Sequence, residues 1–379
     1  IVTVCSELKK MNVLEPIGGK AYVAEVLNSV PSPGNVDYYA SIVQEKALLR
    51  RLIDTSGEIL DASFEDSQPV DNILGEAQRQ ILELSKENIQ NDLVRIDSVV
   101  SNVWDNINET YDNPDHILGT TTGFKDLDAM TSGFQKSDLI ILAARPAMGK
   151  TALCLNFAMN AAVQNDSTIA IFSCEMPKEQ LALRMLSAEA RVNMGRLRTA
   201  NIAEHEYRGL SQALGRLSEA PIYIDDTPSI TPVALRAKCR RLQMESEISL
   251  VIIDYLQLMR SGQRRVESRF QEVSEIVREV KSIAKELQVP IIALSQLSRD
   301  VEKRGGDIPK LSDLRESGEI EQTADLVLFI HRDDYYDNST ESFSPTKIVI
   351  AKQRNGPTGQ VDLVFRKDVS RFEMASAAV

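Results

Sequence analysis

Residues 143–153, AARPAMGKTAL, combine small residues with a lysine and a threonine, a set that can hold the phosphates of a nucleotide. In a loop of the form A/G-x-x-x-x-G-K-S/T, backbone N–H groups and the start of the following helix surround the phosphates. The lysine reaches the β- and γ-phosphates, and the hydroxyl ligates Mg²⁺. The match runs from Ala144 to Thr151, with alanine at the first glycine position. The alternative is an ordinary strand–turn–helix. The residues expected to bind nucleotide are Ala147, Gly149, Lys150, Thr151 and Ala152.

Three more polar side chains follow apolar runs that are typical of strands. Asp254 ends SLVIID, and an acid on a strand beside a phosphate loop suits a Mg²⁺ site. Glu175 follows TIAIFSC, where a carboxylate could orient and deprotonate the attacking water. Gln296 ends VPIIALSQ and could hydrogen-bond the γ-phosphate or the water. Each has a structural alternative: a buried strand-end acid, a helix-starting acid and a satisfied strand-end amide.

Two segments near the C-terminus carry groups that could contact nucleic acid or the nucleotide of a neighbouring subunit. Residues 312–322, SDLRESGEIEQ, place a loop at the start of a helix, where backbone amides could hold a nucleic-acid phosphate. Residues 351–359, AKQRNGPTG, end a strand with Lys352 and Arg354, which share one face because alternate residues of a strand point the same way. That arrangement suits an arginine finger supplied by a neighbouring subunit. The alternative is a solvated basic strand edge. The residues of the first segment that we single out are Arg315, Glu316 and Gly318.

The loop RSGQRRVESRF, residues 260–270, is polar and carries four arginines and a phenylalanine. Cations with an aromatic ring suit backbone contacts to a strand of nucleic acid. RAKCRR, residues 236–241, is also basic, but its helical spacing predicts a solvated helix face.

The elements that would position these groups are short apolar strands separated by helical segments. Near-continuous apolar strands alternating with helices indicate a parallel sheet covered on both faces, whose ligands bind at the carboxyl ends of the strands. The predicted fold is therefore an α/β domain with a mainly parallel sheet, over residues 117–379. The expected strands are 138–144, 168–174, 221–226, 249–254, 289–296, 324–330, 346–352 and 361–366.

The region before this domain has a different pattern. Residues 1–86 show apolar spacings of three and four without a convincing strand, which predicts an all-helical domain. Residues 87–116 are polar with one amphipathic segment near 99–107, which we interpret as a linker with a docking helix. The alternative is a further core helix of the first domain. The chain opens mid-pattern and without methionine, so we expect an N-terminal truncation.

Composition and charge leave a DNA-binding function open. The chain has 379 residues, 43% hydrophobic and 26% charged, with no apolar run near the roughly 18 residues that a membrane span needs. Its four cysteines lie far apart without metal-ligand spacing, as in reduced cytosolic proteins. Net charge is −12, but residues 1–116 hold 9 basic and 20 acidic residues, whereas residues 117–379 hold 34 and 35. The overall acidity therefore does not exclude nucleic acid as a partner.

Six segments, in this order, together resemble the bacterial replicative DNA helicases of the DnaB family: ARPAMGKTAL, FSCEMP, VIIDYLQLM, ALSQLSR, SDLRESGEIEQTADLVLFIHR and AKQRNGPTG. TTGFKDLDAMTSGFQKSDLIILAA is similar to the approach to that family's motor, and residues 7–53 resemble its N-terminal domain, inside which this chain begins. The resemblance implies a RecA-like motor and a ring of six subunits. It also implies ATP and Mg²⁺ as cofactors, and 5′→3′ movement on single-stranded DNA at a replication fork.

The resemblance also implies residue roles. Glu175 would polarise the water, Thr151 and Asp254 would support Mg²⁺, Gln296 would sense the γ-phosphate and Arg184 would contact the nucleotide. The set Lys352, Gln353 and Arg354 would reach the nucleotide of a neighbour, and the set Arg315, Glu316 and Gly318 would touch the DNA backbone.

The implied partners are primase, on the N-terminal domain, and a helicase loader. No membrane partner is expected, and the implied location is the cytoplasm at replication forks.

Two other classes remain as alternatives. A RecA/KaiC-type DNA-dependent ATPase without processive unwinding would share the phosphate loop but lack RESGEIEQ and the helical N-terminal region. An inactive ring scaffold would lack Glu175, Asp254 or Arg354, and all three are present.

Overall fold

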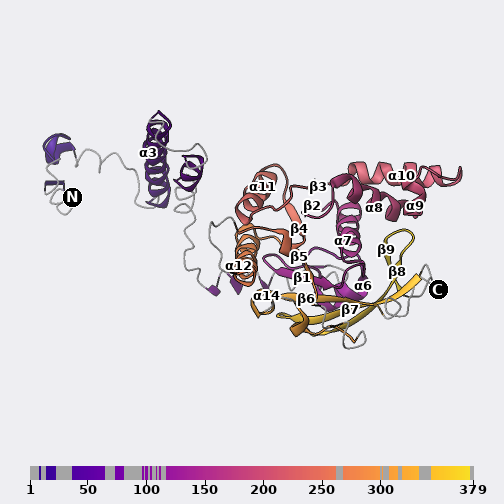
Figure 1. The fold of residues 1–379 in the computed structure, drawn as a ribbon. Coiled ribbons are helices and arrows are strands. Elements are labelled where there is room, and N and C mark those ends of the chain that lie inside the picture. Colours follow the sequence, from indigo (N-terminus) through magenta and orange to yellow (C-terminus); the bar gives the residue numbers. More distant parts are fainter. Residues whose placement is uncertain are drawn as a thin grey trace. The chain divides into compact units, whose positions relative to one another are not determined.

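The chain divides into two compact units, residues 1–100 and 101–379 (Figure 1). The first contains helix α3 (Val36–Phe64) and a helix over residues 73–80. This confirms the helical prediction for the described part of that region; most of residues 99–107 lies outside it, and the boundaries at 86 and 116 stay predictions. The computed structural model describes residues 8–9, 14–22, 36–64, 73–80, 96–97, 99–100, 103–104, 108, 111, 117–261, 268–298, 301, 307–314, 318–332 and 343–375.

The second unit is built on one sheet, whose described strands run in the order β3-β2-β4-β5-β1-β6-β7-β8-β9. The six strands from β3 to β6 are parallel, and β7, β8 and β9 continue the sheet antiparallel. The strands are β1 (Leu139–Ala144), β2 (Thr168–Ser173), β3 (Ile222–Asp225), β4 (Ile248–Asp254), β5 (Ile291–Gln296), β6 (Leu326–His331), β7 (Phe343–Gln353), β8 (Gly359–Arg366) and β9 (Arg371–Met374).

All eight expected strands are present, and the mainly parallel sheet is confirmed. The ninth strand, β9, was not predicted. It is only four residues long, RFEM, and its polar residues give it a weak apolar signal. Pairing with β8 through Phe365 and Phe372 makes it a strand, so its formation depends on the tertiary structure.

Helices cover both faces of the sheet (Figure 1). Alternate residues of β1 enter two separate cores: Ile140, Leu142 and Ala144 pack with α7, and Leu139, Ile141 and Ala143 pack with α12. The helices are α6 (Lys125–Thr131), α7 (Lys150–Asn165), α8 (Lys178–Ala190), α9 (Met194–Arg198), α10 (Glu206–Glu219), α11 (Pro232–Glu245), α12 (Arg269–Leu287) and α14 (Gly318–Thr323), with 3-10 turns η2 (Leu256–Leu258) and η3 (Leu311–Asp313).

Local sequence explains where the outer helices begin. Thr231 caps α11 by accepting a hydrogen bond from the Ala234 N–H, and Pro232 follows at the first helical position. The basic run of residues 236–241 lies on α11, as predicted, where Arg240 pairs with Glu286 of α12. Within the described residues, no helix combines the length and the apolar character that crossing a bilayer demands.

Candidate active site

The loop between β1 and α7 has the backbone of a phosphate cradle. Two of its residues have positive φ, Ala147 at 62° and Gly149 at 97°. A Cβ on Gly149 would lie 3.0 Å from the ring of Phe372, so both the conformation and the space at this position favour glycine. Gly149 is the N-cap of α7, and Ala152 is buried in the first turn of that helix. The start of α7 therefore faces the loop, where its N–H groups can bind phosphate.

Two buried arginines tie this loop to the rest of the domain. Arg145 donates to the carbonyl of Leu297 at 2.8 Å. Arg332 donates to the carbonyl of Ala147 at 3.4 Å and lies 5.1 Å from the centre of the Phe365 ring. These contacts fix the loop before any ligand binds, which lowers the entropy lost on binding.

Thr151 and Asp254 form the oxygen-rich side of the site. The Thr151 hydroxyl donates to Asp254 Oδ2 at 2.8 Å. Asp254 is buried, and its Oδ1 has no hydrogen-bond partner among the described residues. Burial raises the pKa of Asp254, while the Thr151 hydrogen bond and the Lys150 charge oppose that rise. A hydroxyl beside an unpaired carboxylate oxygen is a donor set that fits Mg²⁺.

Lys150 lies beside this pair in a partly buried position. Its Nζ donates to the carbonyl of Ser295 at 3.2 Å and lies 5.0 Å from the centre of the Tyr255 ring. Burial lowers the pKa of Lys150, and the charges of Asp254 and Glu175 act against that decrease. A phosphate bound here would add negative charge and favour the protonated amine.

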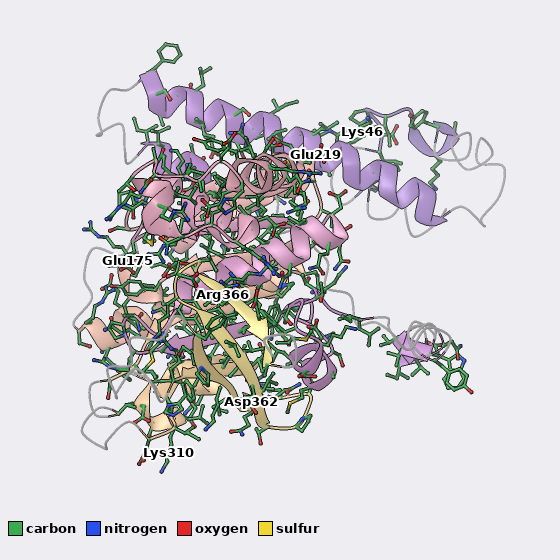
Figure 2. The ribbon with its side chains drawn as sticks, turned by 90° about the vertical axis from the view of Figure 1, so that its right-hand side faces the viewer. Lys46, Glu175, Glu219, Lys310, Asp362 and Arg366 are labelled. Carbon is green, nitrogen blue, oxygen red and sulfur yellow. The ribbon has the colours of Figure 1, made fainter. Side chains whose placement is uncertain are left out.

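Glu175 lies in the loop between β2 and α8, where Figure 2 labels it, and its side chain is exposed. Ser173 fixes this loop, because its hydroxyl donates to the Met176 carbonyl at 2.8 Å and accepts from the Met176 N–H at 3.1 Å. The Cys174 N–H donates to the carbonyl of Asp254 at 2.7 Å. Glu175 therefore follows a residue bonded directly to the strand end that carries Asp254.

Gln296 and Arg184 lie near the same loop. Gln296 is paired in register with Ala144, the residue at which the phosphate-loop motif starts. Arg184 on α8 is close enough to Asp254 to lower the pKa of that carboxyl, against the larger effect of burial. Its Nε is buried without a partner among the described residues. The residues that the structure brings to this edge of the sheet are Ala147, Gly149, Lys150, Thr151, Ala152, Glu175, Arg184, Asp254 and Gln296.

The other predicted nucleotide ligands, Lys352, Gln353 and Arg354, lie at the opposite edge. Gln353 pairs with Leu326 at the start of β6, and Leu326 pairs with Ile140 at the start of β1. The phosphate loop follows the other end of β1, and the four residue steps from Ile140 to Ala144 span about 13 Å of strand. The structure therefore does not bring these three residues to the phosphate loop of their own chain.

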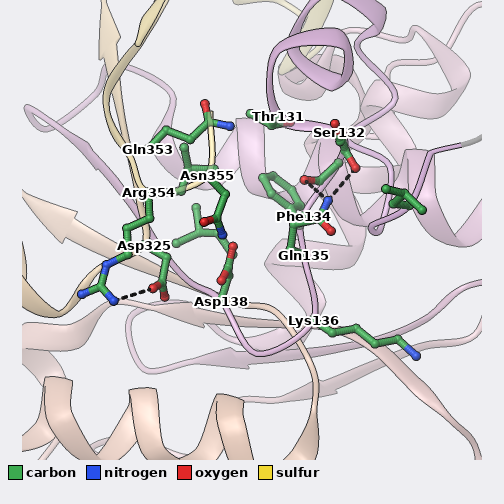
Figure 3. Close-up of a pocket in the computed structure, with 14 residues that line it drawn as sticks. Thr131, Ser132, Phe134, Gln135, Lys136, Asp138, Asp325, Gln353, Arg354 and Asn355 are labelled. Atoms are coloured by element: carbon green, nitrogen blue, oxygen red, sulfur yellow. Dashed lines mark hydrogen bonds and ion pairs between the residues drawn. The ribbon is translucent and has the colours of Figure 1, made fainter. Parts of the chain in front are cut away.

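At that edge the three side chains bond within their own chain. Figure 3 shows Arg354 paired with Asp325. Lys352 and Arg354 both reach the end of α14, so they share a side of the strand as expected. Gln353 points the other way and donates to the carbonyl of Met130 at 3.1 Å. Burial lowers the pKa of Lys352, with the Arg354 charge as the next cause.

Of the residues expected to contact DNA, the structure describes only Gly318, which is exposed at the start of α14. Arg315 and Glu316 lie outside the described residues, as do residues 262–267 of the arginine-rich loop. Leu314 forms a bridge with Leu297, just beyond the end of β5. The segment leading to Gly318 therefore starts at the edge of the sheet that carries the phosphate loop.

Two family models match this chain. The DnaB-like helicase C terminal domain matches residues 119–374, and the DnaB-like helicase N terminal domain matches residues 1–45. The chain belongs to the DnaB-like helicase family. The replicative DNA helicase DnaC of Bacillus subtilis (strain 168) is 50% identical over 372 residues, which cover 98% of this chain and 82% of that protein. The replicative DNA helicase DnaB of Geobacillus stearothermophilus is 49% identical with the same coverage.

Two solved structures share the fold. One is an ATPase domain that is 38% identical with a TM-score of 0.70, covering 75% of this chain and 99% of that one. The other is a DnaB-like replicative helicase, described together with its interactions with primase, which is 32% identical with a TM-score of 0.74, covering 98% and 86%. The RecA-like α/β motor after a helical N-terminal region is therefore confirmed.

As a DnaB-like helicase, the protein is an ATP-hydrolysing enzyme of DNA replication that unwinds DNA. The two family models and the relatives confirm the resemblance to the DnaB family.

Sequence reasoning missed several residues that support this site. Ser173 and Ser295 are internal to recognised segments, FSCEMP and ALSQLSR, but only the acid and the amide beside them carried a chemical signal. Asp325 and Arg332 also lie inside a recognised segment, SDLRESGEIEQTADLVLFIHR, but their partners are distant in the sequence. Phe372 lies outside all the recognised segments and contacts the position of Gly149 from β9.

Proposed function

We propose that this DnaB-like helicase works as a ring of six subunits that moves 5′→3′ on single-stranded DNA and unwinds the duplex at the replication fork. The observation that carries the proposal is the incompleteness of the site in one chain. Lys352 pairs with Val327 near the start of β6, and Arg354 follows the end of β7, so both lie toward the end of β1 that is away from the phosphate loop. In a ring, that edge of one subunit faces the phosphate loop of the next, and the site is completed between them.

The phosphate-loop half would bind and orient the nucleotide. Lys150 holds the β- and γ-phosphates, and the N–H groups around Gly149 hold the remaining oxygens. Thr151 and Asp254 would hold Mg²⁺, which neutralises charge on the transferring phosphoryl group when bound. Arg184 contacts the nucleotide from α8.

The remaining groups act on the attacking water and on the developing charge. Glu175 accepts a proton from the water, and Gln296 hydrogen-bonds the γ-phosphate or the water. Arg354 of the neighbouring subunit stabilises the charge of the transition state, with Lys352 and Gln353 beside it.

Single-stranded DNA would be bound mainly through its backbone. The loop with Arg315, Glu316 and Gly318 contacts phosphates, so binding is tolerant of sequence and sensitive to salt. The near-neutral charge of residues 117–379 permits such contacts, since the acidic excess lies in residues 1–116.

The N-terminal region would provide the assembly contacts. Residues 1–86 form the helical domain that binds primase, and residues 87–116 form the linker with its docking helix. The primase assignment draws on the DnaB-like relative whose structure was described with its primase interactions. A helicase loader places the ring on DNA, and the protein works in the cytoplasm at replication forks.

The mass of the assembly, with and without an ATP analogue, tests the ring of six. Strand separation on forked duplexes in which only the 5′ tail or only the 3′ tail is single-stranded tests the direction of movement. We expect six chains per assembly and ATP-dependent unwinding only when the 5′ tail is available for loading. DNA-dependent ATP hydrolysis without strand separation on either fork would instead favour the RecA/KaiC-type alternative.

A further inference from the structure

Arg354 is held by its own chain at the edge of the sheet away from the phosphate loop. Its Nη2 donates to the carbonyl of Gln322 at 2.9 Å, and its Nη1 lies 3.5 Å from Asp325 Oδ1 (Figure 3). Its backbone N–H donates to the carbonyl of Asp325 at 2.9 Å. Both the backbone and the side chain of Arg354 are therefore bonded to the segment that joins α14 to β6.

Lys352 is bonded to the same segment. Its Nζ donates to the carbonyls of Glu321 at 2.5 Å, Ala324 at 2.7 Å and Gln322 at 3.3 Å. Carbonyls at the end of a helix lack partners within the helix, and a cation there satisfies them. The carbonyls at the end of α14 accept from both cations, and the carboxylate of Asp325 pairs with Arg354. We call these carbonyls together with the Asp325 carboxylate the seat.

Asp325 is itself firmly placed. Its carboxylate is almost fully buried and accepts from the Leu139 N–H at 2.8 Å and from Lys281 Nζ at 2.5 Å. Lys281 also donates to the carbonyl of Ser137 at 2.7 Å. Oδ2 is therefore bonded to the start of β1 and to α12, while Oδ1 faces Arg354. A buried acceptor fixed by the sheet can hold a mobile guanidinium in one place.

The seat leaves Arg354 able to act elsewhere. Half of its side chain is exposed, next to a cavity of about 300 Å³ that Asp138 and Asn355 also line. A guanidinium has five N–H donors, more than the seat engages. Arg354 can keep one edge on the seat while it presents another to an anion outside the chain.

We propose that Asp325 is a positioning residue for Arg354, and that the seat, which also holds Lys352, aims Arg354 at the nucleotide of the neighbouring subunit. This inference rests on the proposed function, in which Arg354 acts between subunits. Precise placement of a finger matters because a displacement of about 1 Å can lower a rate by about 10².

The test is Asp325→Asn, which keeps an oxygen acceptor and removes the charge. We expect ATP turnover of the assembled protein to fall by about 10- to 100-fold, with a KM for ATP changed less than about 2-fold. In the Arg354→Ala background, Asp325→Asn should cause no further loss, because the two act as one unit. Asp362→Asn is the matched control, since Asp362 is an exposed acid on β8 that does not line this cavity, and its turnover should stay normal.

Mixed rings separate positioning from a general structural role. Asp325→Asn subunits have an intact phosphate loop, and Lys150→Ala subunits have an intact seat and finger. Mixing the two should restore part of the turnover if Asp325 acts through the finger on a neighbour. If mixed rings form and stay inactive, Asp325 supports its own phosphate loop and the proposal is wrong.

Asp325→Glu serves as a second variant if Asp325→Asn does not fold, because it keeps the charge for Lys281 but moves it by one methylene. A turnover loss that mixing restores then supports the proposal, and normal turnover overturns it. If Arg354→Ala loses turnover and folded Asp325→Asn does not, the positioning role of Asp325 is wrong and the proposed function still stands. If Arg354→Ala itself keeps normal turnover, the error lies in the proposed function.

Discussion

The two ends of strand β1 are built in opposite ways. At its carboxyl end, one contiguous segment, residues 144–151, supplies the loop, the lysine and the hydroxyl. At its amino end, the polar cavity is assembled from three separate places in the chain, Asp138, Asp325 and Arg354. The first half is recognisable as a motif, whereas the second exists only after the sheet has formed. This difference agrees with the proposed function, in which each chain contributes the phosphate loop to its own nucleotide site and Arg354 to the site of a neighbouring subunit.

The two ends also differ in their electrostatics. At the carboxyl end, burial raises the pKa of Asp254 and lowers that of Lys150, and the two charges stabilise each other. At the amino end, burial together with Asp325 raises the pKa of Asp138 to about 6, and Lys281 and Arg354 oppose that rise. A buried carboxylate with an unpaired oxygen suits a metal ion, and an exposed arginine on a fixed acid suits contact with another molecule.

The largest expected effect tests whether the two ends belong to one site in the assembly. Lys150→Ala removes the main charge that binds phosphate, and Arg354→Ala removes a finger worth roughly 10³–10⁵ in rate. Each variant alone should be nearly inactive in ATP hydrolysis. Mixed rings should recover part of the activity, because an intact loop then meets an intact finger. Inactive mixtures, with mixed hexamers confirmed by mass, would show that Arg354 does not act on a neighbour.

A smaller effect isolates the chemistry at the carboxyl end. Glu175→Gln should lower ATP turnover by about 10²–10⁴, since the water loses its base, and should leave nucleotide binding intact because the cradle is unchanged. Fluorescent-nucleotide titration and steady-state turnover measure the two quantities. Glu179→Gln, an exposed acid in the first turn of α8, is the control and should have normal turnover. Loss of nucleotide binding in Glu175→Gln would make Glu175 structural.

The cradle at the carboxyl end should also depend on its backbone. Gly149→Ala introduces a Cβ at φ 97° and 3.0 Å from Phe372, so we expect the free energy of unfolding to fall by about 1–3 kcal/mol. Gly215→Ala on α10 is the matched control, because no atom lies within 4 Å of its added Cβ, and it should be neutral or stabilising. Thermal unfolding of both variants measures the difference. Equal melting temperatures would mean that the loop relaxes to accept a side chain.

The smallest effect concerns the amino end and pH. Burial raises the pKa of Asp138 to about 6 in the folded chain, from the 3.8 that stands for the unfolded chain. Between these two pH values the folded state therefore binds more protons than the unfolded state. Stability should therefore fall as pH rises from about 4 to 6 and stay lower above 6. Asp138→Asn removes this loss, so at pH 8 we expect its free energy of unfolding to exceed that of the parent chain. The expected gain is only about 1 kcal/mol, because Asp138 is partly exposed and solvent screens its charge.

Denaturant unfolding of Asp138→Asn and the parent chain at pH 4 and pH 8 measures that gain. Asp362→Asn, on an exposed position of β8, is the control and should change stability little at either pH. A gain at pH 4 equal to that at pH 8 would contradict the titration of Asp138 as its cause.

The sequence by itself determined the parts that are local. The spacing from Ala144 to Thr151 predicted the phosphate loop, and apolar runs predicted eight strands, because burial on both faces leaves a continuous apolar signal. Asp254, Glu175 and Gln296 could be found because parallel strands bring their carboxyl ends to one edge. Their grouping near Lys150 required only the order of strands and helices.

Only the tertiary structure decided where the remaining groups act. The polar strand β9 places Phe372 against Gly149, although the two are more than 200 positions apart in the chain. Antiparallel pairing of β7 with β6 carries Arg354 to the start of the parallel strands, away from its own phosphate loop. Strand direction and register are set by packing between distant segments, and a single contiguous pattern does not contain them.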